Sequence, residues 1–233
     1  MANAARVYSI NTKKELTTPK KTRYNKNTGM NEKYPFKTKE EIKLICNYFL
    51  EKEEYRNLML FVLGINFPLR GSDLCQLQWG DIFTTTYDWR DNFCCVATKT
   101  GKPQWLRLNN NCRQVIKLYL EKTGIRRKDL KFEDYLFTQK GAQGGEHIQR
   151  VRIGRIIQNA CKEVGLDPKK YCSHSLRKTW AYNYYKATND LEMVQKILGH
   201  SCQADTLRYI GIQKENILDA YGVLDDVYGD DLF

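Results

Sequence analysis

Apolar residues recur at helical spacing over most of the chain that follows Phe36. Thr38, with Glu41 three residues later, has the pattern of a helix N-terminus, and Pro68 makes a second helix end by about Phe67. Ser72 could cap a third, short helix that extends to about residue 78. Further helical patterns cover a segment around 115–119 that ends before Gly124, and residues 148–164, 173–187 and 191–198.

Two short segments have the composition of strands instead, at residues 93–98 and 104–108. They are joined by Lys99-Thr100-Gly101-Lys102-Pro103, which predicts a hairpin with a basic tip. Gly80-Asp81 indicates a turn, and the stretch from Gly141 to Gly145 a loop. The pattern therefore predicts a mainly α fold with a small antiparallel β-sheet.

The chain of 233 residues has a net charge of +11. The charge is unevenly distributed and divides the chain into three parts. Residues 1–36 are polar and basic and are predicted to form a flexible arm, and residues 37–210 a single globular domain. Residues 211–233 hold six acidic residues within an amphipathic pattern that includes Ile217, Leu218, Tyr221 and Leu224. A basic arm and a basic body indicate a polyanionic partner, although a basic surface that only aids solubility remains open.

The eight cysteines are scattered without a C-x-x-C pair, and we expect buried, reduced thiols. No cofactor is expected, and no metal site: Cys172 and His174 lack a second ligand pair at zinc spacing. The sequence has neither a signal-peptide pattern nor an apolar run long enough to cross a membrane, so we expect a cytoplasmic protein without a membrane partner.

Five residues from four segments of the chain form a pattern that suits chemistry at a phosphodiester. Arg70 follows the helix-ending proline, and His174 and Arg177 lie in the motif His174-Ser175-Leu176-Arg177. Gly199-His200 follows, and Tyr209 comes nine residues after His200. Guanidinium groups are permanently charged bidentate donors to phosphate oxygens, and a phenolic oxygen can attack phosphorus. Taken singly, most of these residues have an ordinary structural explanation, such as a packed tyrosine or an i,i+3 pair of Arg70 with Asp73.

In order and spacing, this set resembles the catalytic residues of the tyrosine recombinase (phage integrase) family, over roughly Phe36 to Gly211. Lys99 occupies the position at which that family carries a catalytic lysine in a hairpin turn, and Asp73 matches a supporting acidic residue. The resemblance implies the integrase catalytic-domain fold. It also implies site-specific recombination through a 3′-phosphotyrosyl intermediate, as in the integration, excision or inversion of a DNA segment.

The resemblance and the chemistry together suggest a role for each residue. Arg70 and Arg177 would stabilise the charge that develops on phosphorus, and Lys99 would be the general acid, with Lys102 as its rival. His174 and His200 would bind the phosphate or accept a proton from Tyr209, and the sequence does not say which is the base. The predicted DNA contacts are Lys13, Lys14, Lys20, Lys21, Arg23, Lys26, Lys102 and Lys178.

The family also implies partners that the residues alone do not. These are double-stranded DNA, a homotetramer on two synapsed DNA sites formed from protomers that are monomeric when free, and accessory DNA-bending proteins whose need stays open. The acidic tail would dock on a neighbouring protomer. Family members commonly carry a helical core-binding domain before the catalytic domain, whereas only the basic arm precedes it here, as in short relatives or in a truncated chain. The alternatives are a type IB topoisomerase-like activity and a non-catalytic DNA-binding regulator.

Overall fold

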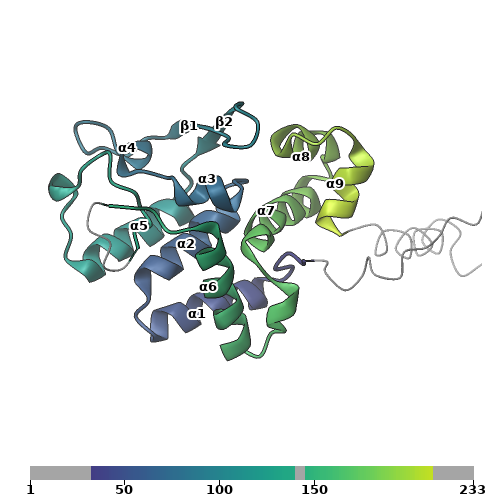
Figure 1. Ribbon diagram of the computed structural model, residues 1–233, viewed down its shortest axis with the longest axis horizontal. Coiled ribbons are helices and arrows are strands. Elements are labelled where there is room, and N and C mark those ends of the chain that lie inside the picture. Colours follow the sequence, from purple (N-terminus) through teal and green to yellow (C-terminus); the bar gives the residue numbers. More distant parts are fainter. Residues whose placement is uncertain (1–32, 140–144, 212–233) are drawn as a thin grey trace, which may run out of the picture. The chain divides into compact units, whose positions relative to one another are not determined.

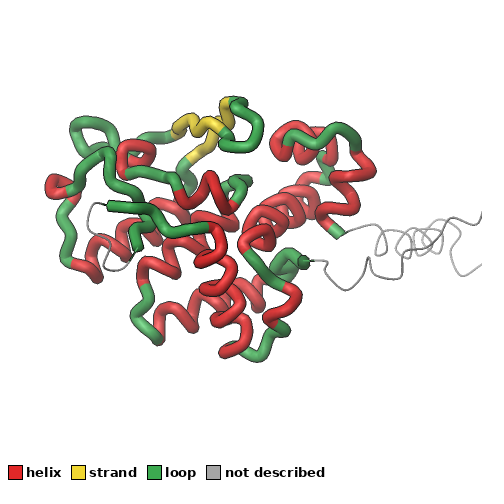
Figure 2. The backbone as a smooth tube through the Cα atoms, viewed as in Figure 1, coloured by secondary structure: helices red, strands yellow, loops and turns green. Residues whose placement is uncertain are grey.

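The computed structural model describes residues 33–139 and 145–211, which belong to one compact unit (Figures 1 and 2). Its elements are α1 (Lys39–Glu51), α2 (Tyr55–Asn66), α3 (Gly71–Cys75), α4 (Trp79–Ile82), β1 (Asn92–Val96), β2 (Pro103–Arg107), α5 (Asn110–Thr123), the 3-10 turn η1 (Arg127–Asp129), α6 (Arg150–Glu163), the 3-10 turn η2 (Pro168–Lys170), α7 (Ser173–Thr188), α8 (Leu191–Leu198) and α9 (Gln203–Ile210). The predicted fold class is confirmed: the described residues are mainly helical, with one two-stranded antiparallel sheet.

Helix ends follow the capping residues that the sequence offers. Thr38 and Glu41 form a reciprocal capping box at the start of α1, in which the threonine hydroxyl accepts from the Glu41 backbone N–H at 3.1 Å. At the other end of α5 and α8, Gly124 and Gly199 have φ angles of 70° and 67°, a left-handed conformation that glycine adopts without strain. These predicted boundaries are confirmed.

The predictions around residues 72–81 were wrong in two respects. Helix α3 begins at Gly71 with Arg70 as its N-cap residue rather than Ser72, and it ends at Cys75. The predicted turn at Gly80 lies within α4, where the Asp81 carboxylate accepts from the Gln78 backbone N–H at 2.8 Å. Gly80 serves a close approach instead of a turn, because an added Cβ would lie 3.1 Å from the carbonyl oxygen of Phe132.

Helix α7 joins two groups of buried apolar side chains. Its N-terminal part packs against α2, where an added Cβ at Gly64 would lie 2.5 Å from Leu176 Cδ1. Its C-terminal part contributes to a second, smaller cluster with α8 and α9, formed by Ala181, Tyr182, Val194, Leu198 and Ile210 (Figure 1). Arg177 directly follows Leu176, so the tight contact between α2 and α7 fixes the backbone position from which the Arg177 side chain extends.

All eight cysteines are free thiols, but the prediction that they are buried was wrong for Cys94 and Cys202, which are exposed. Burial raises the pKa of the Cys46 and Cys75 thiols to about 11. No helix in the described ranges is both long and apolar enough to span a bilayer. The basic arm up to residue 32, the loop at residues 140–144 and the acidic tail from residue 212 lie outside the described residues.

Candidate active site

Four separate parts of the fold carry the predicted chemistry to one region. Arg70 lies at the start of α3, and the β1–β2 hairpin lies beside it. His174 and Arg177 lie on the first two turns of α7, and His200 and Tyr209 follow on the α8–α9 unit (Figure 1). Helix α7 contacts α3, α8 and α9, so it is the common support of the region.

Both arginines line one small pocket of about 140 Å³. Among its lining residues, Lys102 and Lys196 add two more positive charges, and no carboxylate faces the cavity. The wall consists of Arg70, Ala97, Thr100, Lys102, Pro103, Gln104, Arg177, Lys196, Ile197, Leu198 and Gly199. Four cations without a carboxylate make this cavity a site for an anion.

Arg177 is the most deeply buried of these cations, with 4% of its surface exposed. One Nη2–H donates to the carbonyl oxygen of Leu198, the last residue of α8, at 2.9 Å. The Nε–H is buried and makes no hydrogen bond within the described structure. Burial lowers the pKa of the guanidinium from its ordinary value, and the nearby positive charge of Arg70 acts in the same direction. An anion in the pocket would relieve both penalties.

Asp73 joins α3 to the hairpin rather than pairing directly with Arg70. Its Oδ1 accepts from the backbone N–H of Thr98 at 3.0 Å, immediately before Lys99. The side chain is buried, and its Oδ2 has no hydrogen-bond partner within the described structure. The carboxylate therefore anchors the base of the hairpin and places negative charge behind the arginines.

The two candidate lysines of the hairpin occupy different positions. Lys102 lines the pocket beside Arg70 and Arg177, whereas Lys99 lies at the exposed tip and does not reach the pocket wall. The hairpin register pairs Val96 with Pro103, which leaves both lysines in the connecting turn. In the protein without DNA, the geometry therefore does not choose between Lys99 and Lys102 as the general acid.

Tyr209 packs in the second apolar cluster, with the His200 ring against it. The centres of the two rings lie 5.1 Å apart at an interplanar angle of 77°. Burial raises the pKa of Tyr209 to about 12, while the charges of Arg177 and Arg70 act to lower it. The phenol is therefore protonated near neutral pH, and a group that takes its proton is needed before the oxygen can attack.

The surroundings of the two predicted catalytic histidines, His174 and His200, favour the neutral form of each ring. Burial lowers the pKa of His174 below its ordinary 6.5, and the charges of Arg150, Arg177, Lys178 and Arg70 lower it further. Burial and Arg177 lower the pKa of His200 as well. Both imidazoles can therefore accept a proton.

Lys178 occupies the interior of this region. We predicted it as a DNA contact, but its exposed fraction is only 9% and its Nζ lies 5.0 Å from the centre of the Tyr209 ring. This is a cation–π geometry, in which the ammonium group lies over the face of the tyrosine ring. Lys102, the other predicted DNA contact in the described residues, is exposed. The predicted contacts of the basic arm lie outside the described residues.

Two basic residues of the site, Lys196 and Arg150, were not predicted from the sequence. Lys196 lies on the last turn of α8 and lines the pocket, and Arg150 opens α6, where its charge affects His174. Arg150 lies in the helical pattern predicted over residues 148–164, which is also basic, and this was a sequence signal for it. Lys196 carries no sequence signal that separates it from other surface lysines.

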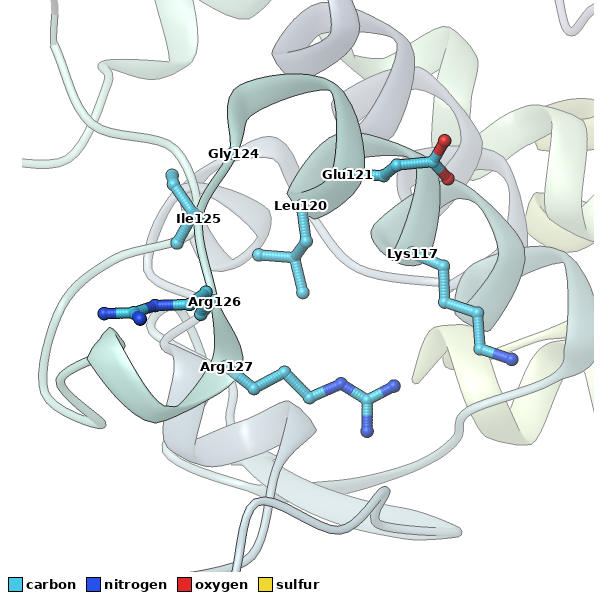
Figure 3. A pocket seen from close by; sticks show the side chains of 7 residues that line it. All are labelled: Lys117, Leu120, Glu121, Gly124, Ile125, Arg126 and Arg127. Carbon is cyan, nitrogen blue, oxygen red and sulfur yellow. The ribbon is translucent and has the colours of Figure 1, made fainter.

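A larger cavity of about 310 Å³ lies at the end of α5, away from these residues (Figure 3). Two of its three basic side chains have local contacts: Arg126 forms an ion pair with Asp129 at 2.6 Å, and the guanidinium of Arg127 lies 4.6 Å from the centre of the Trp89 ring. None of the predicted chemistry lines it. Within the described part of the chain, no group of three His, Cys, Asp or Glu side chains could hold a metal ion.

Comparison with known proteins assigns the chain to a family. Residues 36–216 match the model of the phage integrase family. A probable integrase/recombinase, YoeC of Bacillus subtilis, is 33% identical over 189 residues, which cover 81% of this chain and 95% of YoeC. Tyrosine recombinase XerC of Caldanaerobacter subterraneus is 28% identical over 219 residues, which cover 93% of this chain and 56% of XerC.

Solved structures share the fold. A post-cleavage complex of the XerH site-specific recombinase with its palindromic difH substrate superposes with a TM-score of 0.61 at 19% identity, covering 84% of this chain and 54% of XerH. The XerA recombinase also gives 0.61, at 21% identity, covering 79% of this chain and 63% of XerA. The chain thus spans nearly all of YoeC, but only about half of the longer recombinases XerC and XerH.

Replacing Asp73 tests its proposed role as the anchor of the hairpin. In Asp73→Ala, the Thr98 N–H loses a charged acceptor, a bond of about 1.5–3 kcal/mol, so amide exchange should accelerate over residues 98–101. Hydrogen exchange followed by mass spectrometry measures this. The matched control is Asp88→Asn, whose carboxylate accepts from the Thr86 hydroxyl on the surface and should leave the hairpin unchanged. Unaltered exchange in Asp73→Ala would show that the hairpin is held by other contacts.

Proposed function

Because the chain belongs to the phage integrase family, we propose that it is a tyrosine-type site-specific recombinase, which cuts and rejoins DNA strands through a covalent phosphotyrosyl intermediate. The observation that carries the proposal is the position of Tyr209. It lies within electrostatic reach of both Arg70 and Arg177, the two guanidiniums of a pocket with no carboxylate. Tyr209 does not itself line the pocket, but a tyrosine on which the charges of a positive pocket act suits attack on a phosphodiester.

In the cleavage step, the Tyr209 oxygen forms a bond to phosphorus and the bond from phosphorus to the 5′-oxygen breaks. The tyrosine ends as a 3′-phosphotyrosyl ester, and the cleaved strand leaves with a free 5′-hydroxyl. The ester keeps the energy of the broken bond, so the 5′-hydroxyl of a partner strand can displace tyrosine without ATP. Each step exchanges one phosphodiester for another.

The other residues act on charge and protons. Arg70 and Arg177 stabilise the negative charge on the non-bridging oxygens of five-coordinate phosphorus, in a pocket that is already positive before the reaction. Lys99 donates a proton to the departing 5′-oxygen as the tip of the hairpin reaches the DNA. Asp73 holds that hairpin.

The partner is double-stranded DNA. The chain's YoeC and Xer relatives are named as recombinases, and this favours strand exchange between sites over topoisomerase-like relaxation or a purely regulatory role. We further propose that four protomers, monomeric when free, assemble on two DNA sites and that the acidic tail after residue 211 docks on a neighbour. Accessory DNA-bending proteins and a cytoplasmic location belong to the same proposal.

The basic residues before the catalytic region supply the non-specific part of DNA binding in this scheme. The predicted arm ended at residue 36, but Phe36 is fully buried in the core; the basic residues before it, including the pair Lys13 and Lys14, would contact phosphates and release counterions. The exposed Lys102 would do the same from the hairpin. Base recognition requires contacts other than these.

Removal of the nucleophile tests the function. A DNA duplex nicked next to the cleavage position traps the covalent intermediate of a wild-type recombinase, because the short 5′ fragment diffuses away. In Tyr209→Phe, the adduct should fall by a factor on the order of 10³ or more, while binding in a gel-shift assay stays nearly intact. The matched control is Tyr184→Phe, a partly buried tyrosine of the same cluster, which should still form the adduct. A wild-type protein that binds a duplex carrying its own site but forms no adduct would support the regulator.

The general acid is tested with a pair of lysine variants. Lys99→Ala should slow cleavage by about 10²- to 10⁴-fold, and a substrate with sulfur at the bridging 5′ position should restore the rate, because a thiolate leaves without a proton. Lys102→Ala should weaken binding and gain nothing from sulfur. Selective rescue of Lys102→Ala would transfer the acid role to the lysine that already lines the pocket.

A further inference from the structure

Lys178 lies on the face of α7 that packs against α9, the helix that carries Tyr209. Residues three and four positions apart share one face of a helix, so Lys178 shares its face with Ala181 and Tyr182, which belong to the second apolar cluster. Only 9% of the lysine surface is exposed. Its side chain therefore belongs to the contact between the two helices rather than to an open surface.

The ammonium group of Lys178 lies over the face of the Tyr209 ring, with Nζ 5.0 Å from the ring centre. The face of an aromatic ring carries partial negative charge, so it attracts a cation placed over it. Burial of an ammonium group is unfavourable unless neighbouring groups compensate for the lost water. The tyrosine ring supplies part of this compensation, and the lysine in turn favours the packed position of the ring.

This attraction increases when Tyr209 loses its proton. A phenolate has negative charge on its oxygen and on its ring, so a cation over the ring attracts the phenolate more than the neutral phenol. We propose that Lys178 is a positioning residue of the reaction, which holds the Tyr209 ring against α7 and favours the phenolate form. An interaction that strengthens as the nucleophile forms lowers the barrier to attack instead of only stabilising the resting state.

The inference rests on the proposed function, in which both arginines of the pocket already act on Tyr209. The positive charges of Arg177 and Arg70 lower the pKa of the phenol, whereas burial and the nearby Cys172 thiol raise it. The two arginines line the anion pocket, so a bound phosphate would take up part of their charge. Lys178 is not among the residues that line this pocket, so its charge stays directed at the tyrosine when the phosphate is bound.

Two imidazole rings are also near this pair. His174 lies one turn before Lys178 on α7, and the lysine charge lowers its pKa. The His200 ring packs against the Tyr209 ring, with the ring centres 5.1 Å apart. The surroundings of both imidazoles favour the neutral form, so the positive charge over the tyrosine ring comes from Lys178.

Titration of position 209 in the free protein tests the electrostatic part of the inference without DNA. A single fluorotyrosine incorporated there gives one fluorine NMR signal, and fluorination lowers the ordinary pKa of the phenol. Lys178→Met keeps a long side chain but removes the charge, so the phenol pKa should rise by about 0.5–1. Lys178→Arg keeps the charge and should leave the pKa near its wild-type value. An unchanged or lower pKa in Lys178→Met would overturn the inference.

The same variants separate an effect on the nucleophile from a contact with DNA. In Lys178→Met at saturating nicked duplex, the adduct should form more slowly by a factor of about 5 to 10, while the affinity in a gel-shift assay stays unchanged. Lys178→Arg should restore most of the rate. The matched control is Lys186→Met, at an exposed lysine in the last turn of α7, which should change neither quantity.

Two outcomes of this assay would contradict the inference. A weaker affinity with an unchanged rate in Lys178→Met would make the lysine a DNA contact. Equal losses of rate in Lys178→Met and Lys178→Arg, with the same phenol pKa as in the wild-type protein, would reduce it to a packing role.

The two measurements also distinguish this inference from the function on which it rests. The titration needs no DNA, so it reports on Lys178 and Tyr209 even if the wild-type protein forms no adduct. Conversely, a wild-type adduct together with equal phenol pKa values in the wild-type protein and Lys178→Met would keep the recombinase and remove the role of the lysine.

Discussion

The concentration of positive charge in a small, partly enclosed cavity is the constraint on which the rest of this structure depends. Arg177 is nearly fully buried, Arg70 lies beside it, and no carboxylate lines the pocket they share. Such an arrangement is unfavourable for the empty protein, because like charges repel and burial removes water from them. It becomes favourable when a phosphate enters the pocket. Because negative charge builds up on the non-bridging oxygens in the transition state, the pocket stabilises that state more than the bound substrate.

The scaffold explains how the cations are held together. Helix α7 is clamped on one side by the close packing of Gly64 on Leu176, and on the other it supports α8 and α9. The Arg177 guanidinium bonds the last carbonyl of α8, so the cation and the helix that leads to His200 are positioned by the same contact. Asp73 fixes the hairpin in a similar way from α3. The side chains that carry the chemistry are thus also among the contacts that assemble the fold around it.

Much of this could be predicted from the sequence, because helix caps and apolar periodicity are local. The capping box at Thr38 and the glycine ends at Gly124 and Gly199 are examples. The error near Gly80 arose from a contact with Phe132, which lies 52 residues away and leaves no local trace. In the same way, the order of the arginines, histidines and tyrosine could be read from their motif. The burial of Lys178 against the Tyr209 ring and the presence of Lys196 in the pocket depend on tertiary packing alone.

The central claim is that Tyr209 itself becomes bonded to DNA, and the most direct measurement is to locate that bond. The trapped adduct, digested with protease and nuclease, would be analysed by tandem mass spectrometry for a peptide that carries a nucleotide. With 15 tyrosines in the chain, the outcome is specific. The account predicts the nucleotide on Tyr209. A nucleotide attached to any other residue would contradict it.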